Sequence, residues 1–80
     1  MALDRFAADI LNRCRIAQTG YGGHPNGAKL AVALVLRDWG YLNDVEWTEL
    51  EVKLRIGGDI GGSLAEVDAW LDAIRDELEA

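Results

Sequence analysis

The chain has 80 residues and a formal net charge of −6, and half of its residues are hydrophobic while 28% are charged. These proportions predict one small globular domain over residues 1–80 and exclude a disordered chain. The apolar run over residues 31–36 is far too short to cross a bilayer, which takes roughly 20 residues. Because the N-terminal residues also lack the apolar core of a signal peptide, we expect a cytoplasmic protein.

The charge is unevenly distributed along the chain. Residues 1–43 carry a net charge of +2, whereas residues 44–80 carry −8. The second half would repel a phosphate backbone, so nucleic acid is not the partner that this balance favours. A basic protein surface, or the basic half of a second copy, is the natural complement.

The first predicted helix covers about residues 3–18, where apolar side chains repeat at helical spacing up to Thr19-Gly20. A glycine-rich loop with the only proline follows over residues 20–27. Its glycines have the separation found in phosphate-binding loops, but Leu30 stands after Lys29 where such a loop needs Ser or Thr. His24 has no neighbouring nucleophile or orienting group, so we do not expect an enzyme.

Cys14 is the only cysteine and His24 the only histidine. They can form neither a disulfide within the chain nor a four-ligand zinc site, so we expect no metal and no cofactor. Cys14 falls on the apolar face of the first helix, where a free cysteine behaves as a small hydrophobic side chain.

The stretch over residues 29–36, KLAVALVL, is apolar on every side. Such a run can be a buried strand or a buried helix. A helix over about residues 27–44 is favoured because alanine and leucine outnumber valine, Asn26 can cap it, and no second strand is available to pair with. This helix would cross Gly40; if it ends there, residues 41–44 form a turn.

Two capping boxes predict where the remaining helices begin. Thr48 and Glu51 start a short helix that ends at Gly57-Gly58, and Ser63 and Glu66 start a helix that reaches Leu78. We expect the two to pack as an antiparallel pair, in an all-α bundle of three to four short helices in total, of which the helix over residues 27–44 is the central buried one. The inward faces are predicted to be Leu50, Leu54 and Trp47 in the third helix, and Leu64, Val67, Leu71, Ile74 and Leu78 in the last.

Three carboxylates and two tryptophans are the candidate partner-binding residues. Asp68, Asp72 and Asp76 repeat every four residues on one side of the last helix. They form either a solvated face or a surface for a basic partner, since carboxylates one turn apart do not enclose a cation. Trp70, beside the aliphatic stripe, is the first interface candidate, and Trp39 is the second.

One segment resembles a pattern found in small acidic proteins of actinobacterial viruses, mycobacteriophages especially. It is the G-x-x-L-A-V-A-L-V-L-x-D run of residues 27–38, followed by Trp47-Thr48 and by the glycine-rich step over residues 56–62. Gly40 departs from that pattern. The resemblance covers about half of the chain and implies a small accessory protein in the cytoplasm of an infected bacterium.

These observations lead to one expected function and one alternative. We expect a non-enzymatic protein that contacts another protein, for example a host factor, through an acidic, tryptophan-containing surface. The alternative is a nucleic-acid-associated protein, or an acidic mimic of DNA that regulates a DNA-binding protein. We also expect a homodimer, because the run over residues 31–36 has more apolar surface than a monomer of this size covers easily.

Overall fold

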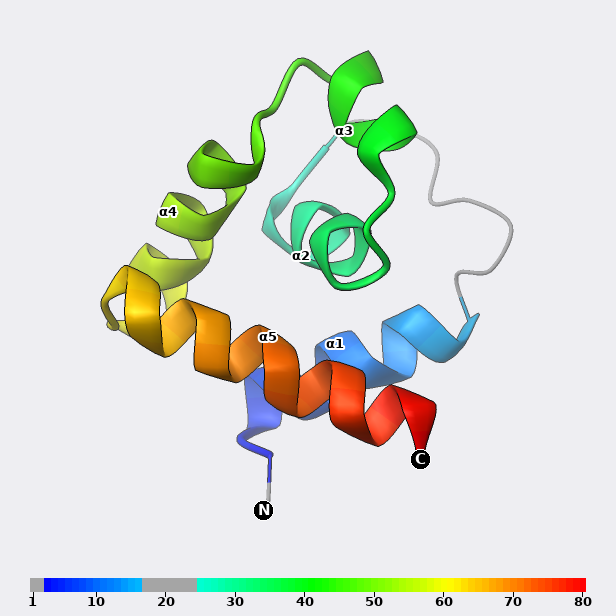
Figure 1. Cartoon of the computed structure of the whole chain (residues 1–80), viewed down its shortest axis with the longest axis vertical. Coiled ribbons are helices and arrows are strands. Elements are labelled where there is room, and N and C mark those ends of the chain that lie inside the picture. The colour runs from blue at the N-terminus through cyan, green and yellow to red at the C-terminus, as the bar shows by residue number, and fades with distance from the viewer. Residues whose placement is uncertain (1–2, 17–24) are drawn as a thin grey trace.

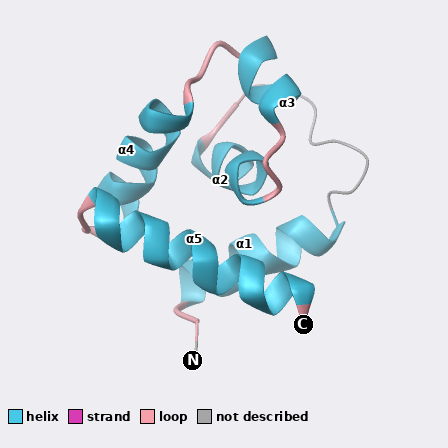
Figure 2. Ribbon diagram, viewed as in Figure 1, coloured by secondary structure: helices cyan, strands magenta, loops and turns pink. Residues whose placement is uncertain are grey.

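A computed structural model describes residues 3–16 and 25–80 of the chain. Within these residues the structure contains five helices and no strand, which confirms the predicted all-α class (Figures 1 and 2). The helices are α1 (Arg5–Ile16), α2 (Gly27–Val35), α3 (Trp39–Asp44), α4 (Glu49–Ile60) and α5 (Leu64–Glu79).

Helix α2 is the centre of the molecule, as its apolar sequence predicts. Asn26 caps it by accepting a hydrogen bond from the Lys29 N–H, and every residue from Leu30 to Val35 is at most 2% exposed. Helices α1, α3, α4 and α5 all contact α2 and surround it (Figure 1). Because the chain covers this run by itself, the run no longer gives a reason to expect a dimer.

The prediction that this helix continues to residue 44 is wrong. The chain leaves α2 at Leu36, where Arg37 has a left-handed φ of 54°. The Asp38 N–H then bonds the Ala33 carbonyl at 2.8 Å, which is the closing bond of a Schellman C-cap. Glycine usually occupies the left-handed position of this motif. Because arginine stands there instead, the sequence gives no signal that the helix ends at this point.

Residues 39–44 form a separate helix, α3, rather than the end of α2 or a turn. The Asp38 carboxylate accepts a hydrogen bond from the Tyr41 N–H at 3.1 Å and so caps α3. Gly40 lies inside this helix. A second left-handed residue, Glu46 with φ 61°, ends the turn that leads to α4.

Both predicted capping boxes are present. Thr48 and Glu51 exchange side-chain and backbone hydrogen bonds at the start of α4, and Ser63 and Glu66 do the same for α5. Helix α4 does not end at Gly57-Gly58 as predicted but continues to Ile60. It ends where Gly61 adopts a left-handed φ of 69°. Helices α4 and α5 are packed against each other and diverge from this corner (Figure 1).

The predicted inward face of α4 is wrong. Leu50 and Leu54 are 55% and 57% exposed, whereas Val52 and Ile56 are buried at 0% and 1%. Trp47, just before the helix, is partly buried against the core. Two apolar pairs at i, i+4 spacing compete in this helix, and the fold buries the β-branched pair.

The inward faces of the other helices agree better with the sequence. In α5, Val67, Leu71 and Ile74 are buried, Leu78 is partly buried, and Leu64 is 42% exposed. Helix α1 buries Ile10 and Cys14, as its apolar spacing predicts. The last residues of the first predicted helix, 17–18, and most of the glycine-rich loop, with His24, lie outside the described residues.

Candidate functional site

The outer side of α5 carries the three predicted aspartates, here called the acidic face. The side chains of Asp68 and Asp72 are 56% and 73% exposed, and Asp76 is also exposed. They repeat at intervals of four residues along a helix of 16 residues that the Ser63 capping box begins. The helix therefore presents them as one row, about 6 Å apart along its axis.

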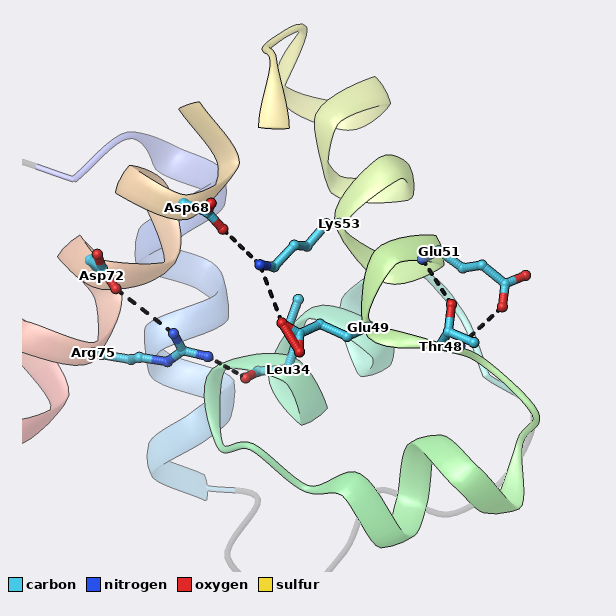
Figure 3. Close-up of polar contacts among 8 residues, drawn as sticks. All are labelled: Leu34, Thr48, Glu49, Glu51, Lys53, Asp68, Asp72 and Arg75. Atoms are coloured by element: carbon cyan, nitrogen blue, oxygen red, sulfur yellow. Dashed lines mark hydrogen bonds and ion pairs between the residues drawn. The ribbon is translucent and has the colours of Figure 1, made fainter. Parts of the chain in front are cut away.

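The lysine nearest this row is held by acidic groups of its own chain. The Lys53 ammonium of α4 lies 2.8 Å from an Asp68 oxygen and 3.3 Å from a Glu49 oxygen (Figure 3). The hydrogen bond with Asp68 raises the pKa of Lys53, because it favours the charged ammonium. This bridge connects α4 to α5.

Arg75 is the only basic residue of α5, and it turns away from solvent. Its side chain is 16% exposed, and its guanidinium donates to the carbonyls of Leu34 at 2.6 Å and Val35 at 3.1 Å. These carbonyls belong to the last turn of α2, where few backbone N–H groups remain to pair with them, although the Leu34 carbonyl also accepts from the Arg37 N–H at 3.2 Å. Asp72 lies 3.8 Å away, at the edge of ion-pair range (Figure 3).

The pKa of Arg75 reflects both its burial and the charged residues around it. Burial lowers the pKa of its guanidinium, and the charge of Arg37 lowers it further, while Asp72, Glu49 and Asp68 act in the opposite direction. The C-terminal end of a helix also favours a cation. Arg75 therefore acts as a structural cation of the α2–α5 contact, and the single basic side chain of α5 contributes little to the exposed surface of that helix.

The third basic residue of the acidic half is also engaged. The Arg55 Nε lies 3.6 Å from an Asp59 oxygen, one turn further along α4. All three bases of residues 44–80 thus have a carboxylate of the same chain within 4 Å, whereas that half contains eleven acids. The excess of negative charge therefore remains uncompensated within this half.

Trp70 does not belong to this surface. It is 8% exposed, and its ring centroid lies 5.2 Å from that of Phe6 in α1, with the planes tilted by 35°. Its position, three residues after Val67 and four before Ile74, places it on the buried side of α5. The expectation of an edge-of-helix interface residue is corrected: this indole joins α5 to α1.

Trp39 lies where a partner could reach it. It is the first residue of α3 and is 48% exposed. It belongs to α3, which packs on α2, while the acidic face belongs to α5. The structure thus separates the two tryptophans that the sequence grouped, one into the core and one onto the surface.

The described side chains form no metal-binding cluster, and Cys14 is buried. Residues 3–16 and 25–80 contain no group of three or more His, Cys, Asp or Glu side chains that could hold a metal ion. Burial raises the pKa of the Cys14 thiol to about 11, and a thiol in that state is a poor nucleophile at neutral pH. Cys14 is therefore a packing residue of α1.

Two features of the charged and apolar surfaces were not predicted from the sequence. Lys53 and Arg75 contact residues 15 or more positions away, so no local pattern indicates their partners. The exposed pair Leu50 and Leu54 was also missed, although the competing pair Val52 and Ile56 is visible as an alternative apolar face in the printed sequence.

None of the described helices is both long and apolar enough to cross a membrane. Comparisons with known proteins give no further indication of function, because no family model, curated protein or solved structure matches this chain.

Proposed function

We propose that this chain is a non-enzymatic interaction protein that binds a basic surface of another protein through the acidic face of α5. Support comes from the arrangement of charge rather than from its amount. Asp72 and Asp76 point outward on a continuous helix, while Arg75 between them is turned inward onto the carbonyls of α2.

Lys53 pairs with Asp68, so Asp72 and Asp76 are the carboxylates of this face that suit a partner with lysine or arginine at matching intervals. Opposite charges steer the two surfaces together and fix their register, and the contribution is screened by salt. Trp70 takes no part in this contact, because it is buried. Trp39 contributes only if the partner extends from α5 onto α3.

The test is affinity capture with the purified chain. A bacterial lysate is the sample of choice because residues 27–62 resemble small phage proteins. We expect the wild-type chain to capture a basic protein at physiological salt and the variant D72N/D76N to lose it. The variant D44N/E46Q removes the same charge from exposed residues of the α3–α4 connection and should retain the partner.

The captured protein is then purified and titrated at several salt concentrations. Binding should weaken steadily as salt increases. Capture that is the same for wild type and D72N/D76N would refute the proposal. A parallel fluorescence-anisotropy titration with duplex DNA tests the alternative of direct nucleic-acid binding, which would give a signal with a steep salt dependence.

A further inference from the structure

A second surface of the molecule is apolar rather than acidic. Among residues 3–16 and 25–80, the exposed large hydrophobic side chains are Ile16, Trp39, Leu50, Leu54 and Leu64. Leu50 and Leu54 are one turn apart on α4 and form what we call the leucine strip.

Folding of the single chain does not account for the leucine strip. Helix α4 already buries Val52 and Ile56 completely, and Gly57 lets it approach Val67 of α5 closely. Exposing Leu50 and Leu54 to water does not stabilise the folded monomer, whereas an exposed apolar patch favours association with another molecule. The strip therefore fits a contact with another molecule.

We propose that the leucine strip is the homodimer interface of this protein, in which α4 packs antiparallel against α4 of a second copy. The charge around the strip supports this occupant. Residues 49–55 contain two acids, Glu49 and Glu51, and two bases, Lys53 and Arg55. A segment with equal numbers of acidic and basic residues can form ion pairs with a second copy of itself, whereas the acidic face of α5 suits a strongly basic partner.

A two-fold axis makes this pairing specific. It reverses the direction of the second helix, so Leu50 packs against Leu54 of the partner subunit and the reverse contact occurs at the other end. The same operation places Glu51 and Arg55 on the same flank of the interface in both copies, with Glu51 about 3 Å along the helix axis from Arg55 of the partner subunit. The Arg55 side chain is 47% exposed and lies 3.6 Å from Asp59, so it can take part in both contacts.

The first test is sedimentation of the full-length chain over a concentration series. We expect the wild type to change from monomer to dimer as concentration rises, and L50Q/L54Q to raise the dissociation constant at least about tenfold, because four leucine side chains leave the interface. The matched control I16Q replaces the most exposed aliphatic residue of α1, which is 74% exposed, and should leave the dimer unchanged.

The second test uses charge reversal. The variant R55E carries only acidic groups at positions 51 and 55, and E51R carries only basic ones, so each alone should dimerise more weakly than the wild type. An equimolar mixture should form a heterodimer that is tighter than either homodimer. Circular dichroism verifies that E51R, which loses one bond of its capping box, remains helical.

Each outcome decides the proposal. A wild-type chain that stays monomeric at every concentration overturns it, and so does a dimer that L50Q/L54Q does not weaken. A dimer that depends on the leucines but shows no heterodimer preference overturns the antiparallel register. Partner capture through α5 is measured separately with L50Q/L54Q, which keeps the acidic face, so the two proposals can fail independently.

Discussion

The guanidinium of Arg75 donates a hydrogen bond to the carbonyl oxygen of Leu34, 41 positions earlier in the chain, at 2.6 Å. A residue of α5 thereby pairs with a carbonyl at the C-terminal end of α2, and the Nε of Arg75 donates to the Val35 carbonyl as well. This contact joins the fold to the charge pattern, because the only cation of α5 is largely buried at the end of α2 and adds little positive charge to the exposed side of α5.

Removing this guanidinium should destabilise the protein. We expect Arg75→Met to lower the free energy of unfolding by about 1–3 kcal/mol, since it leaves two buried carbonyls without their charged donor. Urea denaturation followed by circular dichroism measures the change. Arg5→Met makes the same substitution at an exposed position of α1 and should change stability by less than about 0.5 kcal/mol. Equal effects of the two variants would contradict a capping role.

Two glycines near the end of α4 should respond in opposite directions to alanine. Gly58 lies within the helix, and no described atom is within 4 Å of a Cβ built there, so Gly58→Ala should stabilise the protein by about 0.5–1 kcal/mol. Gly61 has a φ of 69°, so Gly61→Ala should destabilise it by about 1 kcal/mol. Thermal melts of both variants test this, and changes of the same sign would show that the helix end is assigned wrongly.

Stability should depend on pH through Glu51. The Thr48 N–H donates a hydrogen bond to the Glu51 carboxylate at 3.0 Å, and this bond lowers the pKa of Glu51. A lowered folded-state pKa contributes stability above the unfolded-state pKa, and that contribution is lost as pH falls through the folded-state value. Wild type should therefore exceed Glu51→Gln in stability at neutral pH, and the difference should shrink in acid. Denaturation of both proteins over a pH series is the measurement, and a gap that does not change with pH would argue against this cause.

The two tryptophans that the structure separates should differ in their contribution to stability. Trp70 is 8% exposed and packs on Phe6, so Trp70→Ala should cost about 3–5 kcal/mol. Trp39 is 48% exposed, so Trp39→Ala should cost less than about 1 kcal/mol. Urea denaturation gives both values, and a Trp70→Ala variant as stable as Trp39→Ala would place the indole outside the core.

Sequence patterns predicted the features that depend on near neighbours. The capping boxes of Thr48 and Ser63 are local, because each exchanges hydrogen bonds across three residues, and both were found where predicted. The burial of residues 30–35 on all sides follows from their uniform apolarity. Local chemistry therefore predicted the starts of α2, α4 and α5 and the burial of the central helix, but not the separate helix α3.

The features that depend on packing could not be predicted in this way. The left-handed Arg37 ends α2 without the glycine that usually marks such a position, so the sequence looks continuous there. In α4, the pairs at positions 50 and 54 and at positions 52 and 56 are both apolar, and only the placement of α2 and α5 decides which pair is buried. The partners of Lys53 and Arg75 likewise come from other helices.

The position of Cys14 has a practical consequence. It is the only sulfhydryl of the chain, and at 2% exposure it is closed to an alkylating reagent in the folded protein. Modification must wait until α1 separates from its neighbours or the whole chain unfolds. Mass spectrometry of the alkylated fraction over time therefore reports how often this interior opens in the natural sequence, with no engineered label.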